Sequence, residues 1–265
     1  MIVDCHTHLN FDKEEIATAE YLAVCETVGA CIVLAGYNNE KVDNNKKLSE
    51  YLLKQNTNKI IGFASIDPTL QPVGTSGLTG LTEKLGLSGI VVYCSACSFH
   101  PCHSRAMRLY QAAEELGLPV FFHNSGHLKS NAVLDYAQPY LLDEIARTFS
   151  GLKMIIGSMG RPFYEQTLAM IAKHKNVYAD LTIKSTSLWQ IYNIVIQAHE
   201  QSLMEKLLFG SGFPETNPSQ CIETLLGLNK QFGDTNLPAV PIGSIRNTIE
   251  RDTLGILGLS LPDKS

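Results

Sequence analysis

Short apolar stretches alternate along this chain with longer stretches in which apolar and polar residues are mixed with helical spacing. The apolar stretches are continuous, which is typical of parallel strands that are covered on both faces. The sequence predicts eight such strands, at residues 2–5, 30–35, 59–65, 89–93, 119–123, 153–157, 177–181 and 206–210. Helices are expected between and after them, at residues 12–29, 44–53, 78–85, 103–116, 139–149, 162–174, 187–201, 221–229 and 245–257.

Eight strand–helix units in a chain of this length predict a (β/α)8 TIM barrel, an α/β fold in which parallel strands close on themselves inside a ring of helices. An open doubly wound sheet is the alternative architecture. No glycine-rich phosphate loop follows any predicted strand, which counts against the nucleotide-binding version of that alternative. The sequence shows no internal repeat, low-complexity tract or linker, so residues 1–265 are expected to form a single domain.

Composition restricts the partners of the protein. The 265 residues are 45% hydrophobic and carry a net charge of −5 without a long basic run, which argues against nucleic acid and leaves a small-molecule substrate. No stretch of about 18 consecutive apolar residues is present, so no membrane span is expected. The first residues do not form a basic and then apolar leader, and the seven cysteines have no framework spacing. Both features favour a reducing, cytoplasmic setting with free thiols.

The motif His6-x-His8 directly follows the first predicted strand. Side chains two residues apart on a strand point the same way, so both imidazoles would project from one face. Imidazole is the commonest metal ligand in proteins, and two of them side by side can bind one ion. The alternative is that two polar residues merely close a strand.

A third histidine is predicted at the same end of the barrel. In this fold the catalytic groups lie at the carboxyl ends of the strands. His123 follows the fifth predicted strand and would meet His6 and His8 there. Three nitrogen ligands, with a fourth position left for water, form the usual catalytic zinc site. A pocket in which the three histidines only form hydrogen bonds is the alternative.

Four sequence blocks carry a resemblance to a known family. They read VDCHTH at residues 3–8, LYQAAEELGLPVFFHNSG at 109–126, LLDEIARTFSGLKMIIGSMGRP at 141–162 and KLLFGSGFP at 206–214. In order and spacing they resemble the amidohydrolase superfamily, in the branch known as amidohydrolase-related or amidohydrolase 2. That branch includes hydrolases, lactonases and nonoxidative decarboxylases of small carboxylic acids.

The resemblance implies a divalent metal ion on His6 and His8, with His123 as a further ligand. Zinc is the expected ion, before manganese or iron. Two of the family's usual residues are replaced. Ser158 stands where relatives carry a histidine after strand six, and Gly212 stands where they carry an aspartate that binds metal and activates water. The family's strand-four pattern is also absent. With these ligands missing, one ion is expected rather than two.

Two residues are candidates for the missing base. Glu215 lies three residues after Gly212 and could reach the site from its loop, although a solvated loop acid is the alternative. His127 lies four residues after His123 and could act as an acid, a base or an extra ligand, with a surface histidine as the alternative. We predict catalytic roles for His127 and Glu215.

Tyr93 and Arg161 are predicted to bind substrate. Arg161 follows the strand-six turn, and its two-pronged guanidinium suits a carboxylate, although a surface charge is the alternative. Tyr93 opens a loop, residues 93–103, that is rich in cysteine and histidine and is expected to face the substrate; a separate zinc site there would fit no common zinc module. Asp4 is in phase with the metal ligands, and we expect it to point into the barrel either as their partner or as a structural carboxylate. Asp180 ends the seventh strand and could accept a hydrogen bond there, although we expect it to be structural.

These observations predict a metal-dependent hydrolase of the amidohydrolase type that acts on a small amide, ester or lactone. A metal-independent lactonase or a decarboxylase-like relative is the alternative enzyme. A catalytically impaired homologue that binds a ligand without turnover is the alternative from another class, and the missing strand-eight base supports it. The resemblance also implies a homo-oligomer.

Overall fold

Eight parallel strands form one sheet in the computed structural model, which describes the chain except residues 10–13, 38–41, 56, 125–129, 183–184 and 263–265. The strands pair in sequence order, each with the next. They are β1 (Val3–Thr7), β2 (Ala30–Leu34), β3 (Ile60–Ser65), β4 (Gly89–Val92), β5 (Val120–Phe122), β6 (Met154–Ile156), β7 (Val177–Thr182) and β8 (Leu207–Gly210).

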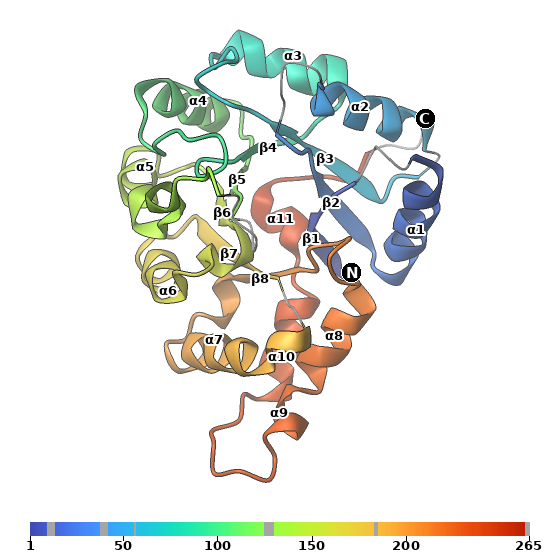
Figure 1. The fold of residues 1–265 in the computed structure, drawn as a ribbon, viewed down its shortest axis with the longest axis vertical. Coiled ribbons are helices and arrows are strands. Elements are labelled where there is room, and N and C mark those ends of the chain that lie inside the picture. Colours follow the sequence, from blue (N-terminus) through green and yellow to red (C-terminus); the bar gives the residue numbers. More distant parts are fainter. Residues whose placement is uncertain (10–13, 38–41, 56, 125–129, 183–184, 263–265) are drawn as a thin grey trace.

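The sheet closes between its first and last strands. Gly212 N donates to His6 O at 2.8 Å, and His8 N donates to Phe213 O at 2.8 Å. The first strand of an open doubly wound sheet does not meet the last in this way. The predicted (β/α)8 barrel is therefore confirmed, with the ring of helices around the strands that Figure 1 shows.

A helix follows each of the first seven strands, and four helices follow the eighth. They are α1 (Glu14–Thr27), α2 (Asn44–Lys54), α3 (Thr75–Leu85), α4 (Ser104–Glu115), α5 (Asp143–Thr148), α6 (Tyr164–Lys173), α7 (Leu188–Glu200), α8 (Pro218–Leu226), α9 (Leu228–Gln231), α10 (Ile242–Ile249) and α11 (Thr253–Leu257). Polar caps define several starts: the Asp43 side chain accepts from Asn45 N and Lys46 N at the start of α2.

Some predicted helices differ from the observed ones. The helix expected from Pro162 begins at Tyr164, because Arg161 and Phe163 have non-helical backbone angles. The helix expected over residues 245–257 is divided into α10 and α11, because the Asp252 side chain caps a new helix at Gly255 N. The stretch 139–149 begins as a 3₁₀ turn before α5.

Buried apolar residues form two layers around the strands. The outer layer packs alternate strand residues such as Cys31 and Val33 against the helices. The inner layer fills the barrel with residues such as Val3 and Phe121, and Leu254 of α11 belongs to it. Figure 1 shows α11 inside the ring of outer helices. The interior is therefore a packed core below the carboxyl ends of the strands, and those ends are left for a site.

Candidate active site

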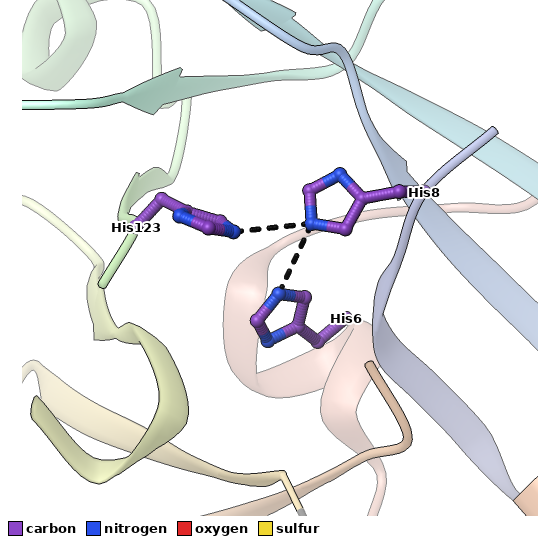
Figure 2. Close-up of side chains that lie close together, drawn as sticks. All are labelled: His6, His8 and His123. Atoms are coloured by element: carbon purple, nitrogen blue, oxygen red, sulfur yellow. Dashed lines mark hydrogen bonds between the residues drawn. The ribbon is translucent and has the colours of Figure 1, made fainter. Parts of the chain in front are cut away.

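The three predicted metal ligands converge at the carboxyl ends of β1 and β5 (Figure 2). The Nε2 atom of His8 lies 3.2 Å from Nε2 of His6 and 3.1 Å from Nε2 of His123. Among the residues that the structure describes, these three histidines are the group that could hold a metal ion. The structure brings together side chains that are more than a hundred positions apart in the sequence.

Strand geometry aims two of these rings at one point. β1 continues to Thr7. Its register with β2 shifts by one residue on the way, because Asp4 pairs with Cys31 whereas Thr7 pairs with Val33. The Thr7 hydroxyl donates to Ile32 O at 2.8 Å and holds this irregular end of the strand. His6 therefore lies inside the strand rather than after it, whereas His8 follows it, and both rings face the barrel mouth.

Hydrogen bonds on the far side of two rings fix which nitrogen faces the centre. His8 Nδ1 lies 3.1 Å from Leu34 O, and a carbonyl oxygen only accepts, so this nitrogen carries the proton. His6 Nδ1 lies 2.9 Å from a carboxylate oxygen of Asp180 and is protonated for the same reason. When both rings are neutral, their Nε2 atoms present lone pairs to each other. A cation between them removes this repulsion.

Burial disfavours a proton as that cation on His8 and His123. The pKa of His8 is lowered to about 3 by burial and by the charge of His6, and burial lowers the pKa of His123 well below its usual value. Burial opposes the charged form of His6 as well, but the charge and hydrogen bond of Asp180 outweigh it and raise the pKa. Nitrogens about 2.0–2.1 Å from one tetrahedral zinc lie roughly 3.3 Å apart, close to the distances observed. The donor set therefore fits a divalent ion.

A cavity of about 420 Å³ opens above the three histidines. Its wall includes three of the predicted site residues, Tyr93, Arg161 and Glu215. The other lining residues are Leu9, Gly36, Tyr37, Asn124, Ser158, Thr182, Gly212 and Pro214. His127, the remaining candidate for a catalytic role, lies outside the described residues.

The three residues differ in what they offer to a ligand. The buried Tyr93 hydroxyl donates to Ala35 O at 2.7 Å, and its ring centroid lies 4.6 Å from that of His123, so Tyr93 presents an aromatic wall. Arg161 Nε donates to the Tyr164 hydroxyl at 3.0 Å, which fixes one edge of the guanidinium. The negative charge of Glu215 adds to the raised pKa of His6 and offsets part of the lowering of the His8 pKa, and this carboxylate lines the same cavity as the histidines.

Two positions that depart from the family pattern have left-handed backbones. Ser158 has φ 48°, and its backbone N–H donates to Asp180. Gly212 has φ +71°, and a Cβ atom added there would lie 2.7 Å from Thr182 Cγ2. This conformation suits glycine and strains most other residues. Gly212 is therefore adapted to its backbone, and an aspartate there would have to displace Thr182.

The prediction that Asp4 points into the barrel is wrong, and its contacts agree with the alternative of a structural carboxylate. Asp4 pairs with Cys31, which belongs to the outer layer, and the register shift breaks the two-residue phase with the histidines. Its carboxylate accepts from the backbone nitrogens of His6, at 3.2 Å, and Ser211, at 2.9 Å. Burial raises the pKa of Asp4 to about 6. Asp4 therefore holds the backbone at the junction of β1 and β8.

Asp180 has a position that its structural assignment did not anticipate. Its side chain is fully buried and contacts the His6 ring, and β7 continues beyond it to Thr182. One signal was available in the sequence: Asp180 and Thr182 share one face at the end of a strand. Nothing in the sequence pointed to His6 as the partner.

The loop after β4 has structural contacts of its own. His100 Nδ1 accepts from Cys102 N, Cys102 Sγ donates to Leu141 O, and the His103 side chain accepts from Arg105 N at the start of α4. These cysteines and histidines form no group with metal-ligand spacing among the described residues. The seven cysteines have free thiols.

The family of the chain follows from comparison with known proteins. The amidohydrolase family model, of the amidohydrolase 2 type, matches residues 60–239, which is more than half of the sequence. The chain belongs to the amidohydrolase family. None of the curated proteins matches this amidohydrolase. None of its described helices has the length and apolar character that crossing a bilayer requires.

Solved structures share the fold of this amidohydrolase at low sequence identity. An uncharacterized TIM-barrel protein from Bordetella bronchiseptica is 15% identical, with a TM-score of 0.68 over 97% of this chain and 99% of that chain. A probable 2-pyrone-4,6-dicarboxylic acid hydrolase from Acinetobacter baumannii is also 15% identical, with a TM-score of 0.65 over 97% and 99%. 5-Carboxyvanillate decarboxylase from Sphingomonas paucimobilis is 11% identical, with a TM-score of 0.66 over 98% and 99%.

Proposed function

We propose that this amidohydrolase is a metal-dependent hydrolase of small amides, esters or lactones, with one divalent ion, zinc first, on His6, His8 and His123. The observation that carries the proposal is the convergence of three Nε2 atoms, with Nδ1 of His6 and His8 engaged elsewhere. A bound divalent ion would polarise a substrate carbonyl and make a water molecule more acidic.

Glu215 is the proposed general base. It lines the same cavity as the histidines, and its charge acts on two of them. A carboxylate in that position can accept a proton from water and return it to the leaving group. His127 is the second candidate for this role, on the sequence argument given above.

The cavity favours a small acid as substrate. Its volume lies within the range of roughly 300–1,000 Å³ typical of small-molecule sites. Arg161 supplies the positive charge that would bind a substrate carboxylate, and Tyr93 supplies a flat wall for an unsaturated or ring-shaped body. The Acinetobacter neighbour has citric acid bound, which agrees with a site for acids.

Decarboxylation of a small aromatic acid is the second candidate function. Gly212 supplies no carboxylate to activate water, and loss of carbon dioxide does not need one. Two neighbours act as decarboxylases, on 5-carboxyvanillate and on 2,6-dihydroxybenzoate.

Metal reloading tests the proposal. The protein is stripped with a chelator and titrated with Zn²⁺, Mn²⁺ or Fe²⁺, and each form is assayed on amides, esters and lactones that do or do not carry a carboxylate. We expect about one equivalent of metal, hydrolysis only in the loaded form, and preference for the acids. Carbon dioxide release from aromatic acids without hydrolysis would favour the second candidate. Equal hydrolysis by the stripped protein would refute metal dependence.

A further inference from the structure

We infer that Asp180 is the anionic partner of the metal site, and that it compensates from β7 for the carboxylate that Gly212 cannot supply on the β8 side. Asp180 would do so through the His6 ring, as a positioning residue rather than as a ligand. The inference rests on the proposed function because it concerns the same metal site.

Hydrogen bonds hold the Asp180 carboxylate against His6. Oδ2 lies 2.9 Å from His6 Nδ1 and accepts from Ser158 N at 2.6 Å. The Thr182 hydroxyl donates to Oδ1 and also lies 2.9 Å from His6 Nδ1. With its Nδ1 proton directed to a carboxylate, His6 presents a more basic Nε2 to the barrel mouth.

Burial favours a positive charge near Asp180. The side chain is fully buried, and its one ion pair in the described part of the chain is with His6. Burying a carboxylate costs free energy, which hydrogen bonds offset in part and a neighbouring cation offsets further. Three neutral imidazoles would leave the double charge of a divalent ion uncompensated. An ion on Nε2 of His6 and the carboxylate on its Nδ1 would balance each other through the ring.

The end of β8 leaves space for the contact between Asp180 and His6. A Cβ atom at Gly210 would lie 2.8 Å from Asp180 Oδ1 and 2.9 Å from His6 Cβ, so the glycine makes room for the contact. Thr182 contributes twice: its hydroxyl holds Asp180, and its methyl group occupies the space that a side chain at Gly212 would enter. The same residue therefore supports the β7 carboxylate and excludes one from position 212.

Metal affinity of the stripped protein tests the inference without relying on turnover. Competition with a chromogenic chelator measures Zn²⁺ and Co²⁺ affinity for the wild type, Asp180→Asn and Asp4→Asn. Asp4→Asn is the matched control, because it also removes a buried carboxylate near His6 but one that contacts backbone nitrogens. We expect Asp180→Asn to weaken binding about 10- to 100-fold and to alter the visible spectrum of bound Co²⁺. Asp4→Asn should lose much less.

The outcomes separate this inference from the proposed function. A wild type that binds about one ion, with Asp180→Asn equal to it, would overturn the role of Asp180 and leave the metal site standing. A wild type that binds no ion would overturn both. If Asp180→Asn does not fold by circular dichroism, Thr182→Val is measured instead, because it keeps the shape of the side chain and removes only the hydroxyl. A several-fold loss of affinity in Thr182→Val supports the inference, and wild-type affinity refutes it.

Discussion

The two sides of the barrel mouth differ in how they depart from the family pattern. The ends of β1 and β5 carry the three histidines, with rings aimed at one point. The ends of β6 and β8 carry Ser158 and Gly212, both with left-handed backbones and without the expected ligands. Between these two ends, β7 carries a buried carboxylate that is hydrogen-bonded to His6 of β1, beside Gly210 of β8. If the three histidines hold an ion, the comparison teaches that the anionic partner of such a site can come from another strand than β8.

The largest effect should come from the histidine side. His8→Gln removes the Nε2 atom that lies closest to the other two, so metal content should fall from about one equivalent to near zero, and activity should be lost. His199→Gln, on α7, is the control and should bind metal like the wild type. Elemental analysis of both proteins is the measurement. Full occupancy in His8→Gln would show that the three histidines are not the site.

Glu215→Gln should have the next largest effect. If Glu215 is the base, kcat should fall about 10²- to 10⁴-fold while metal content stays unchanged, because the amide cannot take a proton. Glu200→Gln, an exposed change on α7, is the matched control. Unchanged kcat in Glu215→Gln would transfer the proposed role to His127.

A carboxylate restored to the β8 side should destabilise the fold. Gly212→Asp combines a left-handed backbone with a contact to Thr182, and we expect a loss of about 2–4 kcal/mol in the free energy of unfolding. Gly86→Asp is the control: its φ is +64° with nothing within 4 Å of the added Cβ, so it carries only the backbone cost. Adding Thr182→Ser to Gly212→Asp should recover part of the loss. Urea unfolding would contradict this account if Gly212→Asp were no less stable than Gly86→Asp.

The smallest expected effect on stability concerns Asp143, which lies away from the barrel mouth. Hydrogen bonds from Lys173 and His174 lower the pKa of Asp143 to about 2, from its usual 3.8. A carboxyl whose pKa is lowered on folding stabilises the protein above its unfolded pKa, and this contribution disappears as the pH falls from about 4 to 2. Asp143→Asn should therefore be less stable than the wild type at pH 7, by less than about 1 kcal/mol because the group is partly exposed.

Thermal unfolding as a function of pH measures this difference. The two melting curves should approach each other below about pH 3. A constant difference across that range would mean that the amide changes packing rather than charge.

The barrel and the convergence of His6, His8 and His123 were predictable, because both depend on local signals. Continuous apolar runs marked the strands, and a strand end placed each histidine at the mouth. The predicted direction of the Asp4 side chain was wrong because the register shift in β1 changes the face of the sheet on which a residue lies. No residue in VDCHTH indicates this shift. Asp180 was undervalued because its partner lies 174 residues away in the sequence. The single domain, the cytoplasmic setting and the homo-oligomer stay predictions.

Packing of α11 against the inner layer of the barrel has a consequence for the order of folding. Leu254 and Leu257 share a buried layer with Val3 and Cys5. On the ribosome, β1 emerges long before these partners and before β8, with which it closes the sheet. Contacts at such sequence separation form late and slowly. A nascent chain therefore cannot close the barrel around the strand that carries His6 and His8 until its last helices have emerged.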